Sequence, residues 1–233
     1  ALAEIGLMKA EGIVAISDDG RPIANGDLMR RALEYASMFD LPVVVHEEDP
    51  NLVAGGQMNE GWASTRLGLP GWPAVAESTM VARDVELAAL TGARLHVAHV
   101  SVRDSLAAIR RARLAKVPVS CEVTPHHLTL TDEDLARSGY DTHYKMNPPL
   151  REKSDIAAIL EGVADGTITV LGSDHAPHTA DRKALEFEAA PFGIVGLETA
   201  LALYIKALIE QGVIDWPRMV AMMTINAARL CGL

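Results

Sequence analysis

Five short apolar runs constrain the fold of this chain more than any other feature. Each run ends in a polar or histidine-bearing segment, and stretches with helical spacing lie between the runs. Short runs rich in β-branched residues are typical of the buried strands of a parallel sheet. Because strands alternate with helices, the sequence predicts an α/β fold. The predicted strands cover residues 12–17, 41–45, 94–98, 117–123 and 167–172.

The stretches between the runs predict helices and two long loops. Asp27 is a candidate N-cap for the first helix, and Gly92 is a candidate C-terminal stop for the second. Long loops at the carboxyl ends of parallel strands often carry function. We expect helices over 27–39, 77–91, 102–115 and 153–164, and functional loops over 48–73 and 178–198.

Length, hydropathy and charge exclude several classes of protein. The chain has 233 residues, of which 49% are hydrophobic, so it is not disordered. It has no run of about 18 apolar residues, so we expect no membrane span. Its net charge of −10, without a basic block, argues against a nucleic-acid partner. Two cysteines cannot build a disulfide framework, which predicts a cytoplasmic protein.

Histidines and aspartates gather at the ends of the predicted strands. Seven of the eight histidines lie in or just after a run, and only His143 does not. The carboxyl ends of parallel barrel strands converge on one mouth, so these residues are expected to meet there. Imidazole and carboxylate are usual zinc ligands, whereas structural zinc prefers thiolates. The pattern therefore favours a hydrolytic metal centre. The carboxylates at equivalent positions are Asp18, Asp19 and Asp174.

Several of these residues also have a purely structural interpretation. His46 could be a core histidine bonded to a backbone carbonyl, and Asp18-Asp19 before Gly20 could form a turn. His96 and His99 are three apart on a strand, so they point to opposite faces. His99 at the strand tip is therefore the better ligand candidate, and His96 is expected to be structural.

The remaining polar residues near the strand tips differ in how specific they are. The pattern at 173–178, SDHAPH, is hard to explain by packing alone. The pair at 126–127 is expected to shape the site rather than to bind metal. Cys121 is expected to be a buried small hydrophobic residue. Three glutamates could each orient a ligand histidine or merely be solvated or capping groups: Glu47, Glu48 and Glu122.

Seven motifs together resemble the bacterial dihydroorotases of the amidohydrolase superfamily, and the resemblance covers the whole chain. It lies in the branch in which an aspartate bridges the metals, because no lysine occupies the tip of the first run. The motifs are specific as a set. They are SDDG at 17–20, VHEED at 45–49, HVAHVS at 96–101, EVTPHH at 122–127, NPPLR at 147–151, SDHAPH at 173–178 and APFGIVGLE at 190–198.

The resemblance implies a metal-dependent (β/α)8 TIM barrel with two Zn²⁺ ions per active site. Asp19, 27 residues before His46, matches the bridging carboxylate. His46 and His99 match the histidines of the second metal. Asp174 matches the aspartate that binds the first metal and moves the catalytic proton. The residues matching substrate-binding positions are Asn147, His178, Phe192 and Gly193.

The activity implied by the resemblance is the reversible cyclisation of N-carbamoyl-L-aspartate to L-dihydroorotate in pyrimidine (UMP) biosynthesis. A hydroxide shared by the two zinc ions attacks the cyclic amide in the hydrolytic direction, and Asp174 carries its proton to the ring nitrogen. The partner is a small-molecule substrate. A homodimer and an association with aspartate transcarbamoylase are left open.

The chain departs from the family pattern in one respect. It contains no His-x-His-x-Arg motif, which the family carries on its first strand, and it begins with Ala1. The ligands above fall on the family's strands four, five, six and eight. We therefore expect residues 1–233 to be a single partial catalytic barrel domain, strands four to eight, without the first three βα units and the flanking β-sandwich.

Two other functions fit the same sequence. Another cyclic amidase, such as a hydantoinase or an allantoinase, would share the barrel and the metals. A non-catalytic dihydroorotase-like scaffold for aspartate transcarbamoylase would share the barrel alone. The four metal ligands that can be checked are all present, which favours an enzyme.

Overall fold

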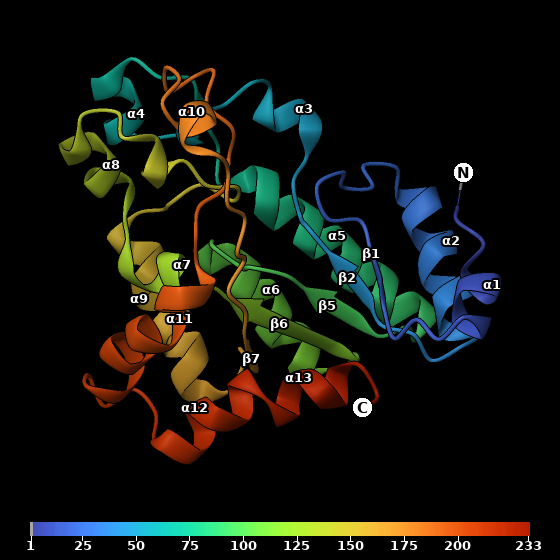
Figure 1. Cartoon of the computed structure of the whole chain (residues 1–233). Helices are drawn as coiled ribbons and strands as arrows, with labels where there is room; N and C mark the ends of the chain where they lie inside the picture. The colour runs from blue at the N-terminus through green and yellow to red at the C-terminus, as the bar shows by residue number, and fades with distance from the viewer. Residues whose placement is uncertain (1) are drawn as a thin grey trace.

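A parallel sheet of five strands forms the centre of the computed structural model, which describes residues 2–233 (Figure 1). Ala1 lies outside the described residues. The strand order is β1-β2-β5-β6-β7, and every neighbouring pair is parallel. Each predicted run contains one strand, so the α/β prediction is confirmed. The strands are β1 (Ile16–Ser17), β2 (Val43–Val45), β5 (Leu95–Val97), β6 (Val119–Val123) and β7 (Val170–Leu171).

Four helices follow the predicted helical stretches closely. The Asp27 cap is wrong: the extended residue Asn25 caps the first of them, and its side chain accepts a hydrogen bond from the Leu28 N–H. Asp27 already lies in the first turn. Gly92 ends the second helix in the left-handed conformation, as predicted. These helices are α2 (Gly26–Ser37), α5 (Val75–Thr91), α6 (Arg103–Leu114) and α9 (Lys153–Asp165).

The two long loops contain short elements at one end of the sheet (Figure 1). Residues 48–73 hold α3 (Pro50–Val53), β3 (Met58–Asn59), α4 (Trp62–Leu67) and β4 (Gly71–Trp72). Strands β3 and β4 pair in parallel. Two-residue strands are too short to show a period, which is why the sequence did not predict them. The loop over 178–198 holds α10 (Ala180–Lys183).

The other helices lie before β1, between β6 and β7, or after β7 along the chain. Helices α12 and α13 lie at the end opposite the long loops (Figure 1). In residues 2–233, no helix has both the length and the apolar character that a membrane crossing needs. The remaining elements are α1 (Ile5–Ala10), α7 (Pro125–Thr129), α8 (Asp132–Ser138), the 3₁₀ helix η1 (Thr142–Tyr144), α11 (Leu197–Tyr204), the π-helix η2 (Ile205–Ile209), α12 (Trp216–Met223) and α13 (Ile225–Leu230).

The two faces of the sheet differ in chemistry. One face packs its apolar side chains into the main hydrophobic core, including Val45, Val97 and Cys121. Cys121 is fully buried, as predicted, and burial raises the pKa of its thiol to about 12. Strand register places Val44, His96 and Ser120 side by side, and alternation puts them on the other face. That second face carries the polar side chains of His96 and Ser120.

Candidate active site

Three predicted ligands converge at the carboxyl end of the sheet. Asp19 follows β1, His46 follows β2 and His99 follows β5. His46 Nδ1 lies 2.9 Å from His99 Nε2, and Asp19 Oδ1 lies 3.2 Å from the former nitrogen and 4.0 Å from the latter. One ligand atom from each residue lies within 4.8 Å of the others, so the group could hold a metal ion.

The chemistry of this donor set fits zinc. Both imidazoles are buried, and two ring nitrogens and one carboxylate oxygen lie within 4.8 Å of one another. The neighbouring imidazoles of His46 and His99 hold the pKa of Asp19 below its usual range, so this carboxylate is ionised. His99 has a φ of +35°, which is uncommon for a residue other than glycine. Such backbone strain is typical of functional sites.

The second ring nitrogen of His46 is held by a carboxylate. His46 Nε2 lies 3.0 Å from Glu48 Oε2, and Asn147 Nδ2 donates to the same oxygen at 2.9 Å. Burial raises the pKa of Glu48, but these two hydrogen bonds outweigh it, so the pKa is lowered. An ionised carboxylate on the far nitrogen fixes the orientation of a ligand imidazole. The orienting interpretation of Glu48 is therefore favoured over the solvated one.

The other two candidate glutamates do not contact the three ligands in this way. Glu122 bonds His96 at 3.3 Å, and His96 Nδ1 lies 2.8 Å from Ser120 Oγ, so His96 is structural as predicted. Glu47 is buried, and burial and the neighbouring Asp84 carboxylate raise its pKa well above the usual value. Among the described residues, neither Glu47 oxygen has a hydrogen-bond partner.

Asp18 plays a different part from Asp19. Its two oxygens accept hydrogen bonds from the backbone N–H groups of His46, at 3.0 Å, and Ile23, at 2.9 Å. Asp18 thus joins the tip of β1 to the tip of β2. The predicted turn is also present, because the Asp18 carbonyl accepts a hydrogen bond from the Arg21 N–H at 2.9 Å. This leaves Asp19 alone to face the histidines.

Asp174 lies at the tip of β7 and is not part of the three-residue group. Its φ is +44°. Asp174 Oδ2 lies 3.9 Å from His126 Nε2, and both atoms are buried without a hydrogen-bond partner among residues 2–233. Burial, with the Asp19 and Glu122 carboxylates, raises the pKa of Asp174. A carboxyl group with a raised pKa is suited to proton transfer.

Asn147 and the segment after it are fixed by His127. His127 Nε2 donates to the Pro148 carbonyl at 3.0 Å, so its Nδ1, 2.8 Å from Thr124 Oγ1, is the acceptor of the neutral ring. With both nitrogens engaged, His127 shapes the site and cannot bind metal. Asn147 Oδ1 is buried and, within the described chain, has no hydrogen-bond partner.

His127 should make stability depend on pH. Burial lowers its pKa well below 6.5, whereas the unfolded chain takes up this proton near pH 6.5. The folded state therefore loses stability as pH falls below 6.5, by up to about 1.4 kcal/mol per pH unit from this group. The free energy of unfolding should be measured with urea between pH 5 and 6.5. Its slope against pH should be smaller for His127→Asn than for the unmodified protein, by up to that amount. Equal slopes in the two proteins would contradict a neutral buried His127.

A buried charge network around Arg151 was not predicted as part of the site. Arg151 Nε donates to Ser101 Oγ at 3.0 Å, and Nη1 donates to Asn59 Oδ1 at 2.9 Å. Arg151 Nη2 lies 3.6 Å from Glu77, which also accepts from the Ser101 and Val102 N–H groups. The network ties the NPPLR segment to β3 and α5. Arg151 was visible in that motif, but Glu77 sits within a helix and gives no sequence signal.

The last predicted residues meet at one turn of the loop over 178–198. His178 Nε2 donates to the Phe192 carbonyl at 2.7 Å. Gly193 has a φ of +119°, and a Cβ there would lie 2.6 Å from the Ala176 carbonyl oxygen. Only glycine fits this close approach. His175 Nδ1 accepts from the Gly196 and Leu197 N–H groups, so it holds the loop rather than the metal group.

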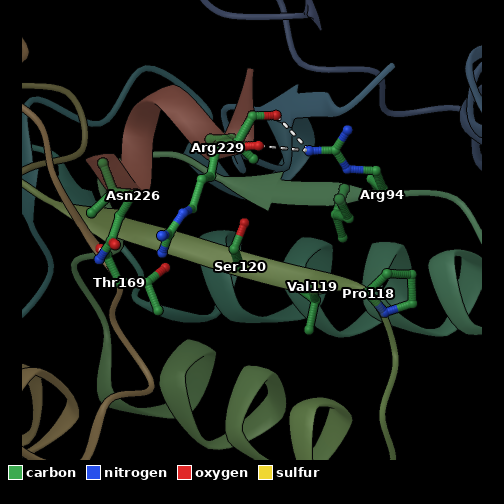
Figure 2. A pocket seen from close by; sticks show the side chains of 10 residues that line it. Arg94, Pro118, Val119, Ser120, Thr169, Asn226 and Arg229 are labelled. Atoms are coloured by element: carbon green, nitrogen blue, oxygen red, sulfur yellow. Dashed lines mark hydrogen bonds between the residues drawn. The ribbon is translucent and has the colours of Figure 1, made fainter. Parts of the chain in front are cut away.

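A pocket of about 400 Å³ lies elsewhere, over the beginnings of β5, β6 and β7 (Figure 2). Arg94 donates to the carbonyls of Leu230, at 2.5 Å, and Arg229, at 3.5 Å. Figure 2 shows Asn226 and Arg229 of α13 on the same side as Ser120 of β6. Because this pocket is lined by the beginnings of the strands, it is separate from the histidines at their tips.

The fold and the site define a class. The chain belongs to the amidohydrolase family, whose sequence pattern matches residues 1–233. It is 56% identical to a dihydroorotase of Anaeromyxobacter dehalogenans over 232 residues, which are 100% of this chain and 53% of that protein. A dihydroorotase of Pelotomaculum thermopropionicum is 55% identical, with 100% and 54% covered. The chain thus spans about half the length of these relatives.

The solved structures give the same fold. The L-hydantoinase (dihydropyrimidinase) of Arthrobacter aurescens superposes with a TM-score of 0.84 at 26% identity. The match covers 98% of this chain and 53% of that one. The parallel sheet is therefore close to that of the hydantoinase barrels, as the fold prediction implied.

Proposed function

We propose that this chain carries much of the active site of a zinc-dependent dihydroorotase. The convergence of Asp19, His46 and His99 at the strand tips is the observation that carries the proposal. Identity of 53–56% to proteins named dihydroorotase supports this substrate over other cyclic amides. In this proposal, residues 1–233 form one part of a catalytic barrel domain.

His46 and His99 would hold one zinc ion, and Asp19 would bind both that ion and a second one. Asp174 would contribute to the other ion, for which the chain offers no further histidine pair of the His-x-His kind. When bound, the zinc ions polarise the ring carbonyl and lower the pKa of the attacking water. Glu48 keeps His46 oriented for this task through its 3.0 Å contact with Nε2.

Asp174 would move the proton. Its carboxylate takes the proton of the attacking water and gives it to the departing ring nitrogen, so it acts first as a base and then as an acid. The raised pKa of Asp174 favours uptake of the proton from the attacking water. In the biosynthetic direction the same group serves in reverse, as N-carbamoyl-L-aspartate closes to dihydroorotate.

The substrate would lie between Asn147, His178 and the Phe192-Gly193 backbone. The chain carries a net charge of −10, so an anionic substrate needs local donors in the mouth of the site. Asn147 is held beside His46 through Glu48, which places the amide close to the metal group. His178 supports the Phe192 carbonyl and so supports the segment that would face the pyrimidine ring.

Turnover of three cyclic amides tests the proposal. The zinc-loaded protein that carries this chain should hydrolyse dihydroorotate with a kcat/KM at least about 100-fold above that for hydantoin or allantoin, a difference of about 2.7 kcal/mol. Ring opening can be followed by loss of ultraviolet absorbance. Preference for hydantoin would instead support the function of the structurally similar hydantoinases. No turnover of any of the three would support a scaffold.

A further inference from the structure

Two buried lysines hold the segment 187–193 by its backbone carbonyls. Lys145 Nζ donates to the carbonyls of Phe187, Glu188 and Ala190 at 2.6, 3.1 and 2.7 Å. Lys183 Nζ donates to the carbonyls of Pro191 and Gly193 at 3.0 and 2.9 Å. With His178 on the Phe192 carbonyl, six of the seven carbonyl oxygens of this segment accept a side-chain hydrogen bond.

Lys145 contacts the same segment in two further ways. Its own carbonyl accepts a hydrogen bond from the Gly193 N–H at 3.0 Å. Its Nζ lies 4.5 Å from the centre of the Phe192 ring, within the range of a cation–π contact. The Trp72 ring also packs against the Phe192 ring in an edge-to-face arrangement, with 5.9 Å between the ring centres. Phe192 and Gly193 are thus fixed from both the backbone and the side chain.

Burying two lysine side chains costs free energy, and filling space in the core does not explain it. Lys145 and Lys183 are 1% and 6% exposed, and among residues 2–233 neither ammonium forms an ion pair with a carboxylate. Buried ammonium groups without a counter-ion are strongly disfavoured unless hydrogen bonds replace their water. Burial, with the charge of Lys183, lowers the pKa of Lys145 to about 8. Here the backbone carbonyls of segment 187–193 replace the water around the two ammonium groups. The two lysines therefore order this loop.

We propose that Lys145 and Lys183 are positioning residues that hold the Phe192-Gly193 backbone in the conformation that receives the substrate ring. The inference rests on the proposed function, which assigns that backbone to the substrate. The lysines come from the segment before Asn147 and from α10, whereas the three metal-group residues follow β1, β2 and β5. Loss of a lysine should therefore weaken substrate binding more than it slows the chemical step.

Lys145→Met and Lys183→Met test this in the zinc-loaded protein that carries the chain. Each variant should raise KM for dihydroorotate by about 10-fold or more and change kcat by less than about threefold. Amide hydrogen exchange should become faster in residues 186–193 and stay unchanged in β5 and β6. Lys153→Met is the matched control, because Lys153 is exposed and, among residues 2–233, pairs only with Glu133 on the surface. It should leave KM and exchange unchanged.

The two variants also protect the test against misfolding. Lys183→Met removes two of the carbonyl contacts and leaves the three of Lys145 in place. Unchanged KM and unchanged exchange in both variants would overturn the proposal. A fall of about 10-fold in kcat with no change in KM would also overturn it. Absence of dihydroorotate turnover in the unmodified protein would instead overturn the proposed function. The exchange experiment needs no substrate, so it would still report whether the lysines hold the segment.

Discussion

Replacing Asp174 with asparagine should lower kcat for dihydroorotate hydrolysis by about 10²- to 10⁴-fold and leave the fold intact. Asparagine has nearly the shape of aspartate but cannot accept and return a proton. Asp174 sits at the tip of β7, and its buried Oδ2, 3.9 Å from His126 Nε2, has no hydrogen-bond partner among residues 2–233. The measurement is kcat of the zinc-loaded variant, with circular dichroism as the check of folding.

Asp181→Asn is the matched control for this substitution. Asp181 lies in α10, in the loop over 178–198 that follows Asp174 along the chain, and is exposed. The control variant should keep the kcat of the unmodified protein. Near-normal turnover in Asp174→Asn would refute the proton-transfer role and would direct attention to another acid in the site.

Replacing His99 with alanine should remove zinc and activity together. His99 is one of the two buried imidazoles whose ring nitrogens lie 2.9 Å apart beside Asp19. Loss of a group that only orients a ligand weakens metal binding by about 10- to 100-fold, and loss of the ligand itself should exceed this. Zinc affinity can be measured by competition with a chromophoric chelator, and turnover of dihydroorotate by the same protein should fall in parallel.

His96→Ala is the control on the same strand. His96 is also buried and lies only three residues earlier, but it bonds Ser120 and Glu122 rather than the metal group. This variant should retain zinc affinity within about threefold, because its ring does not reach the group. Equal loss of zinc in the two variants would contradict a metal site at Asp19, His46 and His99. It would mean that the loss follows from removing any buried histidine.

The strand tips were predictable from sequence because parallel strands bring their carboxyl ends to one edge. His46, His99 and Asp19 each directly follow an apolar run or lie within three residues of one, so the convergence of these three could be inferred without knowing the helices between them. Asp174 was predicted by the same logic but lies outside the three-residue group. Its left-handed φ and its orientation depend on the turn after β7, which no period in the sequence reports.

The parts that sequence could not predict depend on partners far along the chain. Lys145 and Lys183 bond backbone carbonyls up to 45 residues away, and a carbonyl acceptor has no signature in the amino-acid letters. Glu77 meets Ser101 from the first turn of α5, where a glutamate is ordinarily explained by the helix dipole. The Asn25 cap was missed because Asp27 is an equally good capping residue, and only the backbone conformation distinguishes the two.

Removal and return of zinc test the central claim most directly. The protein that carries this chain should lose dihydroorotate turnover after dialysis against a strong chelator and regain it on addition of Zn²⁺. The His99→Ala variant should not regain it. Turnover that survives complete removal of metal, or zinc that restores the variant as well as the unmodified protein, would contradict a metal centre built on Asp19, His46 and His99.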